Sequence, residues 1–111
     1  MKKLNQKPIV SVYMPVFNAA PYLSQAIESI LNQTYSNFEF IIVDDASTDS
    51  SWKIIKSYAA SDKRIKIHRN SIDLGVSLTS NIAISKARGA FLARIDADDV
   101  ALSDRLEKQI N

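Results

Sequence analysis

Residues 38–45 read Phe38-Glu39-Phe40-Ile41-Ile42-Val43-Asp44-Asp45, a nearly continuous apolar run that leads straight into two carboxylates. Such a run is typical of a strand buried on both faces, as in a parallel sheet covered by helices. Upstream, residues 9–14 are β-branched and aromatic and predict another strand, which we expect Pro15 to end. Both stretches therefore predict strands inside a layered α/β structure.

Helical and extended patterns alternate along the rest of the chain. Apolar residues at helical spacing run from Pro21 to about Gln33, over residues 52–59, and over residues 78–83, where Gly89 is the expected C-terminal cap. Short strands are expected at residues 65–67, nearer an edge, and at residues 90–95, and a last helix opens at Leu102. The order βαβαβαβα predicts a three-layer α/β/α fold with a mostly parallel sheet. We expect residues 1–111 to form one domain.

The composition excludes several classes of site. The chain has 111 residues, no cysteine and only two glycines, Gly75 and Gly89. These counts rule out a disulfide scaffold, a cysteine-based metal site, a thiol nucleophile and the glycine-rich phosphate loops. A formal net charge of +2 is too small to indicate a nucleic-acid partner, and we expect none. No apolar stretch suits a signal peptide or a membrane span, so we expect a cytoplasmic location, including a peripheral one at the inner face of the membrane.

Acidic residues follow two of the predicted strands. Asp44 and Asp45 come after residues 38–43, and Asp96, Asp98 and Asp99 follow residues 90–95. Because ligands of open α/β sheets bind outside the carboxyl ends of the strands, we expect these five carboxylates to converge on one edge. Carboxylates packed together need a cation among them, and hard oxygen ligands suit Mg²⁺ or Mn²⁺. The residues therefore predict a divalent metal that presents a diphosphate.

Structural roles for these carboxylates stay open at this point. Asp44 or Asp45 could cap the helix that follows, since aspartate is a common N-cap residue. Asp99 or Asp104 could instead favour the start of the last helix through its dipole. Asp96 and Asp98 could simply be solvent-exposed residues of a loop.

Several motifs, in order along the chain, resemble those of family 2 glycosyltransferases, which have the GT-A fold. They are VSVYMPVFN at residues 10–18, SILNQTY at 29–35, IVDDASTD at 42–49, DADD at 96–99 and DRLEKQ at 104–109. The resemblance runs from about residue 8 to the end of the chain. It implies the Rossmann-like, nucleotide-binding half of a GT-A domain.

The resemblance implies roles for residues that would hold the nucleotide of a nucleotide-sugar, with a UDP-sugar favoured. The backbone near Pro15 and Phe17 would border the base. Asp45 would accept a hydrogen bond from the base, and Asp44 would support the turn. Asp96 would lie near the ribose and the diphosphate.

The resemblance also implies a Mn²⁺ or Mg²⁺ site made by Asp96, Asp98 and Asp99, with Asp98 as the main ligand. The metal would neutralise charge on the departing nucleoside diphosphate, and an acceptor hydroxyl would attack the anomeric carbon with inversion, helped by a general base. The acceptor would be a glycan or a lipid-linked sugar.

The chain departs from the family pattern in three respects. Ser80 stands where many members carry an arginine before Asn81, which removes one possible phosphate contact. Ala46 stands where the family often has glycine, and alanine can replace glycine there only if φ stays negative. No residue up to Asn111 is a credible catalytic base, so we expect no catalytic residue here. We expect a partial GT-A domain, truncated after the Asp-X-Asp motif, that binds the donor without transferring the sugar.

Two other classes of function remain as alternatives. A signalling receiver domain also alternates strands and helices and clusters aspartates, although its acidic pair follows the first strand. A non-catalytic interaction module would self-associate through the sheet edge and helix faces that truncation leaves uncovered.

Overall fold

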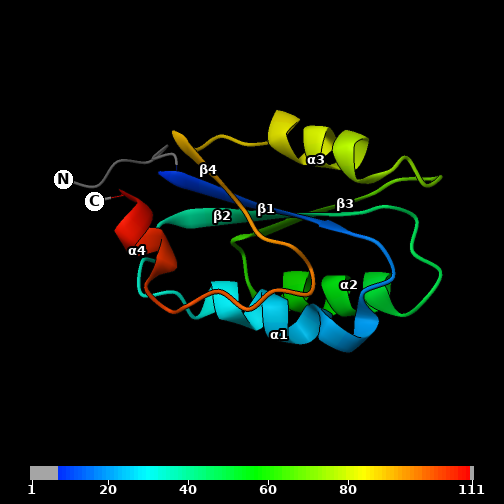
Figure 1. Ribbon diagram of the computed structural model, residues 1–111, viewed down its shortest axis with the longest axis horizontal. Coiled ribbons are helices and arrows are strands. Elements are labelled where there is room, and N and C mark those ends of the chain that lie inside the picture. Colours follow the sequence, from blue (N-terminus) through cyan, green and yellow to red (C-terminus); the bar gives the residue numbers. More distant parts are fainter. Residues whose placement is uncertain (1–7, 111) are drawn as a thin grey trace.

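The computed structural model describes residues 8–110, which form four strands alternating with four helices (Figure 1). In chain order these are β1 (Val10–Val16), α1 (Ala20–Leu31), β2 (Phe38–Asp44), α2 (Ser51–Ser61), β3 (Ile65–Arg69), α3 (Val76–Ser85), β4 (Phe91–Arg94) and α4 (Arg105–Ile110). The predicted alternation is confirmed. Pro21 lies in the first turn of α1, where its missing N–H costs no hydrogen bond.

The four strands form one parallel sheet in the order β3-β2-β1-β4. Every residue of β2 is buried, as the apolar run predicted, and β3 lies at an edge. Helices α1 and α2 cover one face of the sheet and α3 covers the other, so the predicted three-layer α/β/α fold is confirmed (Figure 1). No helix within residues 8–110 is long and apolar enough to cross a membrane.

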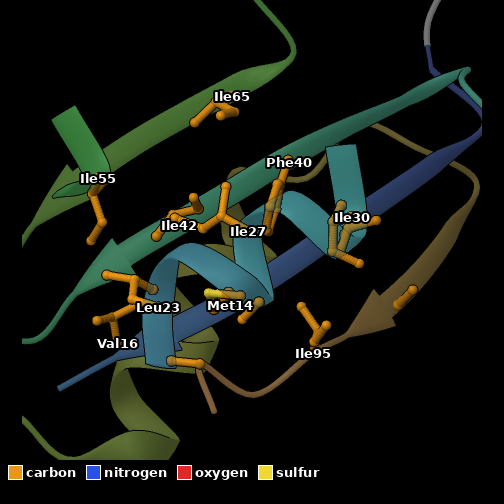
Figure 2. Close-up of a cluster of buried hydrophobic side chains, with 14 of the residues drawn as sticks. Met14, Val16, Leu23, Ile27, Ile30, Phe40, Ile42, Ile55, Ile65 and Ile95 are labelled. Atoms are coloured by element: carbon orange, nitrogen blue, oxygen red, sulfur yellow. The ribbon is translucent and has the colours of Figure 1, made fainter. Parts of the chain in front are cut away.

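The main core fills the space between the sheet and α1 (Figure 2). Met14 and Phe40 from the central strands meet Leu23 and Ile27 from α1, and all four side chains are fully buried. Each such apolar side chain contributes about 1.5–3 kcal/mol by leaving water. A smaller cluster under α3 contains Ala83 and buries the opposite face of the sheet. The core therefore fixes the strand ends from which the loops of the candidate site project.

Pro15 does not end β1, which continues to Val16. The Tyr13 carbonyl accepts from the backbone of Ile95 after β4, whereas the Val16 carbonyl accepts from the β2 side. Because backbone groups alternate along a strand, the nitrogen of Pro15 faces the β4 side, and pairing with β4 has already ended at Tyr13. The missing N–H therefore removes no ladder hydrogen bond.

Gly89 is not the C-terminal cap of α3, because that helix ends at Ser85 and Lys86 caps it. A Cβ at Gly89 would lie 2.8 Å from the backbone nitrogen of Ser11 and 2.9 Å from the carbonyl oxygen of Ile9. Its own N–H donates to the Ser11 hydroxyl at 2.8 Å. Glycine is thus required here by the close approach of two backbones.

Candidate nucleotide-binding site

The loop after β1 and the loop after β2 are joined by hydrogen bonds centred on Asn18. Its side-chain oxygen accepts from the backbone N–H groups of Thr48, at 2.8 Å, and Asp49, at 3.3 Å. Its own backbone N–H donates to the Ser47 hydroxyl at 2.9 Å. These contacts hold the adjacent Phe17, which is 53% exposed, in a fixed place beside Asp45.

Asp44, the last residue of β2, is completely buried and stabilises the turn of residues 44–47. Its Oδ2 accepts from the backbone N–H of Ser47 at 3.0 Å and lies 3.4 Å from the guanidinium Nε of Arg69. The same arginine donates to the Ser47 carbonyl at 3.1 Å. The first residue of α2 is Ser51, so Asp44 does not cap that helix, and Arg69 is a partner that sequence reasoning missed.

Asp45 holds the loop between β3 and α3 with both carboxylate oxygens. Oδ1 accepts from Leu74 N–H at 2.7 Å and from the Asn70 side chain at 2.9 Å, and Oδ2 accepts from Gly75 N–H at 3.0 Å. Burial alone would raise the pKa of Asp45, but these three hydrogen bonds outweigh it, so the pKa lies below its usual value. Asp45 is therefore a fixed, ionised acceptor, and the alternative of capping α2 is wrong for it as well.

A cleft of about 260 Å³ opens beside Asp45. Its lining combines the end of β1 with the start of α3 and consists of Pro15, Val16, Phe17, Asp45, Asp73, Gly75, Val76 and Thr79. The predicted Pro15, Phe17 and Asp45 are thus brought together. The contribution of residues 73–79 was missed, although the predicted loop at the carboxyl end of β3 was a signal for it. Two carboxylates, Asp45 and Asp73, and the exposed aromatic ring of Phe17 suit a flat group that carries hydrogen-bond donors.

Asp96 and Asp98 line a second cleft of about 280 Å³, which shares Pro15, Phe17 and Val76 with the first. Ile95 and Ala97 are buried while the two aspartates between and after them are exposed, so this alternation turns both carboxylates outward. Asp96 is paired with Arg94 at 3.0 Å. The two clefts therefore adjoin, with Asp45 in one and the Asp-X-Asp carboxylates in the other.

The five carboxylates do not all converge. Asp44 lies beneath its turn, and Asp99 lines a separate hollow with Asp104 and Lys108. Within residues 8–110, no group of three or more His, Cys, Asp or Glu side chains is close enough to hold a metal by itself. Two exposed carboxylates nevertheless fit Mg²⁺ or Mn²⁺, which typically takes one or two carboxylates and completes its shell with phosphate oxygens and water.

Ala46, between these functional residues, has φ +56°. The prediction that alanine can replace glycine at this position only with a negative φ is therefore wrong. Alanine holds the left-handed conformation here because Asp44 and Asp45 on its N-terminal side, and Ser47 on its C-terminal side, are each fixed by hydrogen bonds.

Comparison with known proteins identifies this arrangement. The family model for glycosyl transferase family 2 matches residues 11–111. An uncharacterized glycosyltransferase of Haemophilus influenzae is 44% identical over 104 residues, which are 94% of this chain and 42% of that protein. The UDP-Glc:alpha-D-GlcNAc-diphosphoundecaprenol beta-1,3-glucosyltransferase WfgD of Escherichia coli is 38% identical over 93% of this chain and 40% of its own length.

Two solved structures share the fold. A crystal structure of S. aureus TarS, residues 1–349, in complex with UDP-GlcNAc superposes with a TM-score of 0.86 at 27% identity, covering 95% of this chain and 30% of that one. The mannosyltransferase PcManGT of Pyrobaculum calidifontis, in complex with GDP-Man and Mn²⁺, gives a TM-score of 0.76 at 26% identity, over 85% of this chain and 28% of that one.

The chain thus spans well under half the length of these relatives. The match of the family model to nearly all of the chain, together with the relatives and the GT-A structures, leads to one assignment. The chain belongs to glycosyl transferase family 2.

Proposed function

We propose that this chain binds the nucleotide part of a sugar-nucleotide donor, with a UDP-sugar favoured. The observation that carries the proposal is the cleft in which the ionised Asp45 lies beside Pro15 and the exposed ring of Phe17. A carboxylate that already accepts three hydrogen bonds is held rigidly, and it retains lone-pair capacity for an N–H of the base. Phe17 then borders the base and Asp44 keeps the turn in place.

The diphosphate belongs in the adjoining cleft, beside Asp96 and Asp98. We propose that these two side chains hold a Mn²⁺ or Mg²⁺ ion, with Asp98 as the main ligand, and that Asp99, which lines the separate hollow, is not a ligand. When bound, the metal neutralises charge on the departing nucleoside diphosphate. Asp96 also pairs with Arg94, which lines the same cleft, so the arginine helps to orient this carboxylate. The Mn²⁺ bound by PcManGT supports this assignment.

For the whole protein we propose transfer of the sugar, with inversion, to a glycan or lipid-linked acceptor. The name of WfgD describes a diphosphoundecaprenol-linked acceptor, which supports the lipid-linked case. The general base is expected outside residues 1–111, which form the donor-binding part of a GT-A domain. A cytoplasmic location, including a peripheral one at the inner face of the membrane, stays part of this proposal.

Membership of the glycosyltransferase family argues against the receiver-domain alternative, and the Asp44–Asp45 pair follows the second strand rather than the first. Self-association stays a prediction. Phe91 and Leu92 are about half exposed on β4, which is an edge strand of the sheet formed by residues 8–110. Size-exclusion chromatography that gives a clean monomer at high concentration would contradict it.

Isothermal titration calorimetry with UDP in Mn²⁺ tests the proposal. Binding by the parent chain is expected to weaken about tenfold or more in Asp45→Asn and Asp98→Asn, since each loses a charge-assisted contact. Asp104→Asn is the control, because it also removes one carboxylate charge but lies in the separate hollow beside Lys108. A folded parent chain that gives no heat with UDP and Mn²⁺ would overturn the proposed function.

A further inference from the structure

The C-terminal end of α1 holds residues 101–106, which follow the acidic turn of residues 96–99. Gln33, just after that helix, is only 6% exposed. Its Nε2 donates to the Leu102 carbonyl at 2.6 Å, and its Oε1 accepts from the Leu106 N–H at 3.0 Å. Nε2 also donates to the Ser29 carbonyl at 3.0 Å. Both ends of one buried amide are therefore used to join α1 to residues 102–106.

Neighbouring side chains add to this junction. The Ser29 hydroxyl accepts from the Ala101 N–H at 3.0 Å. Thr34 donates through its backbone to the Ser103 carbonyl at 2.8 Å and through its hydroxyl to Glu107 at 2.6 Å. We call this set the α1 clamp, and it consists of Ser29, Gln33 and Thr34.

The clamp lies immediately downstream of the acidic turn. Figure 1 shows the chain leaving β4, turning, and running back along α1 to α4. Before the turn, Ile95 is buried and donates to the Tyr13 carbonyl at 3.1 Å. After the turn, Ala101 is the first residue that the clamp holds. Residues 96–99 are thus fixed from the sheet on one side and from the clamp on the other.

We propose that Gln33 is a positioning residue for the carboxylates of Asp96 and Asp98. It touches neither ligand nor metal, and it acts by fixing the backbone on which these aspartates stand. The proposal rests on the proposed function for its consequence, metal-dependent nucleotide binding, but its structural part is independent of any ligand. A buried amide suits this task because its loss leaves the buried Leu106 N–H and the partly buried Leu102 carbonyl without their partner.

Amide hydrogen exchange tests the structural part directly. Gln33→Met keeps the side-chain length and removes the amide. We expect exchange at the Asp99 and Ala101 amides to accelerate about tenfold, the effect of losing about 1.4 kcal/mol of local stability. The exposed Thr34→Val is a milder second variant, with a smaller acceleration of about threefold at the same amides, in case Gln33→Met does not fold.

The matched control is Glu39→Gln. Glu39 is also buried, and its Oε2 accepts from the Ser11 hydroxyl and from the Arg88 N–H, both at 2.6 Å. These contacts lie near the N-terminal ends of β1 and β2, whereas the acidic turn follows the C-terminal end of β4. Glu39→Gln is expected to destabilise the chain without accelerating exchange in the acidic turn. Unchanged exchange at Asp99 and Ala101 in both clamp variants, or equal acceleration in the control, would overturn the proposal.

Calorimetry tests the consequence. We expect Gln33→Met to lose about tenfold of the gain in UDP affinity that Mn²⁺ provides and to keep the affinity measured without metal. A variant that retains the whole gain overturns the positioning role. A parent chain that binds no UDP overturns the proposed function instead, and hydrogen exchange still decides whether Gln33 fixes the turn.

Discussion

Ala46→Gly is expected to stabilise the chain, although it removes a methyl group from the turn that directly follows Asp45. Alanine at φ +56° adopts the left-handed region, which costs a residue with a Cβ about 1–2 kcal/mol. Glycine avoids this cost but gives the unfolded chain more freedom, which offsets about 0.4–1 kcal/mol. The difference is a gain of about 0.5–1 kcal/mol, or about 3–5 °C in Tm for a domain of this size.

Urea unfolding followed by circular dichroism measures this difference. Asn18→Gly is the informative control, since Asn18 also has a positive φ, +48°. Its side-chain oxygen accepts from Thr48 and Asp49, so glycine there is expected to destabilise the chain by about 1–2 kcal/mol. Opposite signs at the two left-handed positions would show that the side-chain hydrogen bonds of Asn18, and not φ alone, decide the outcome. An Ala46→Gly midpoint at or below that of the parent, with an unchanged m-value, would refute the reasoning.

Two further predictions concern acid stability and close packing. Hydrogen bonds hold the pKa of Asp45 below its unfolded value, so its stabilisation is present above that value, near 3.8, and is lost as the pH falls through the lower folded pKa. The stability difference between the parent and Asp45→Asn should therefore narrow on acidification below about pH 4, and a constant difference would contradict this. Gly89→Ala would drive a Cβ to 2.8 Å from the Ser11 backbone and should cost about 1–3 kcal/mol, with a wild-type Tm as the contrary result.

Strands and layers were predictable because local pattern and burial agree. The run over residues 38–44 is apolar because both faces of β2 are covered, and the sheet order confirms it. The two errors of detail, at Pro15 and Gly89, have a common cause. Each residue type was interpreted from its own backbone preferences, as a strand end and as a helix cap. What decided its place was the position of a neighbouring strand, since β4 stops pairing before Pro15 and Ser11 approaches Gly89.

The candidate site divides in the same way. The acidic residues could be placed at strand ends from the pattern, but Asp44 and Asp45 are identical in type and adjacent in sequence. Their environments differ because Arg69 reaches one of them, while the loop that ends at Gly75 closes over the other. These partners lie 25–30 residues away along the chain, so no local pattern reports them. The role of a carboxylate at a strand end therefore depends on which loop packs against it, as the different partners of Asp44 and Asp45 show.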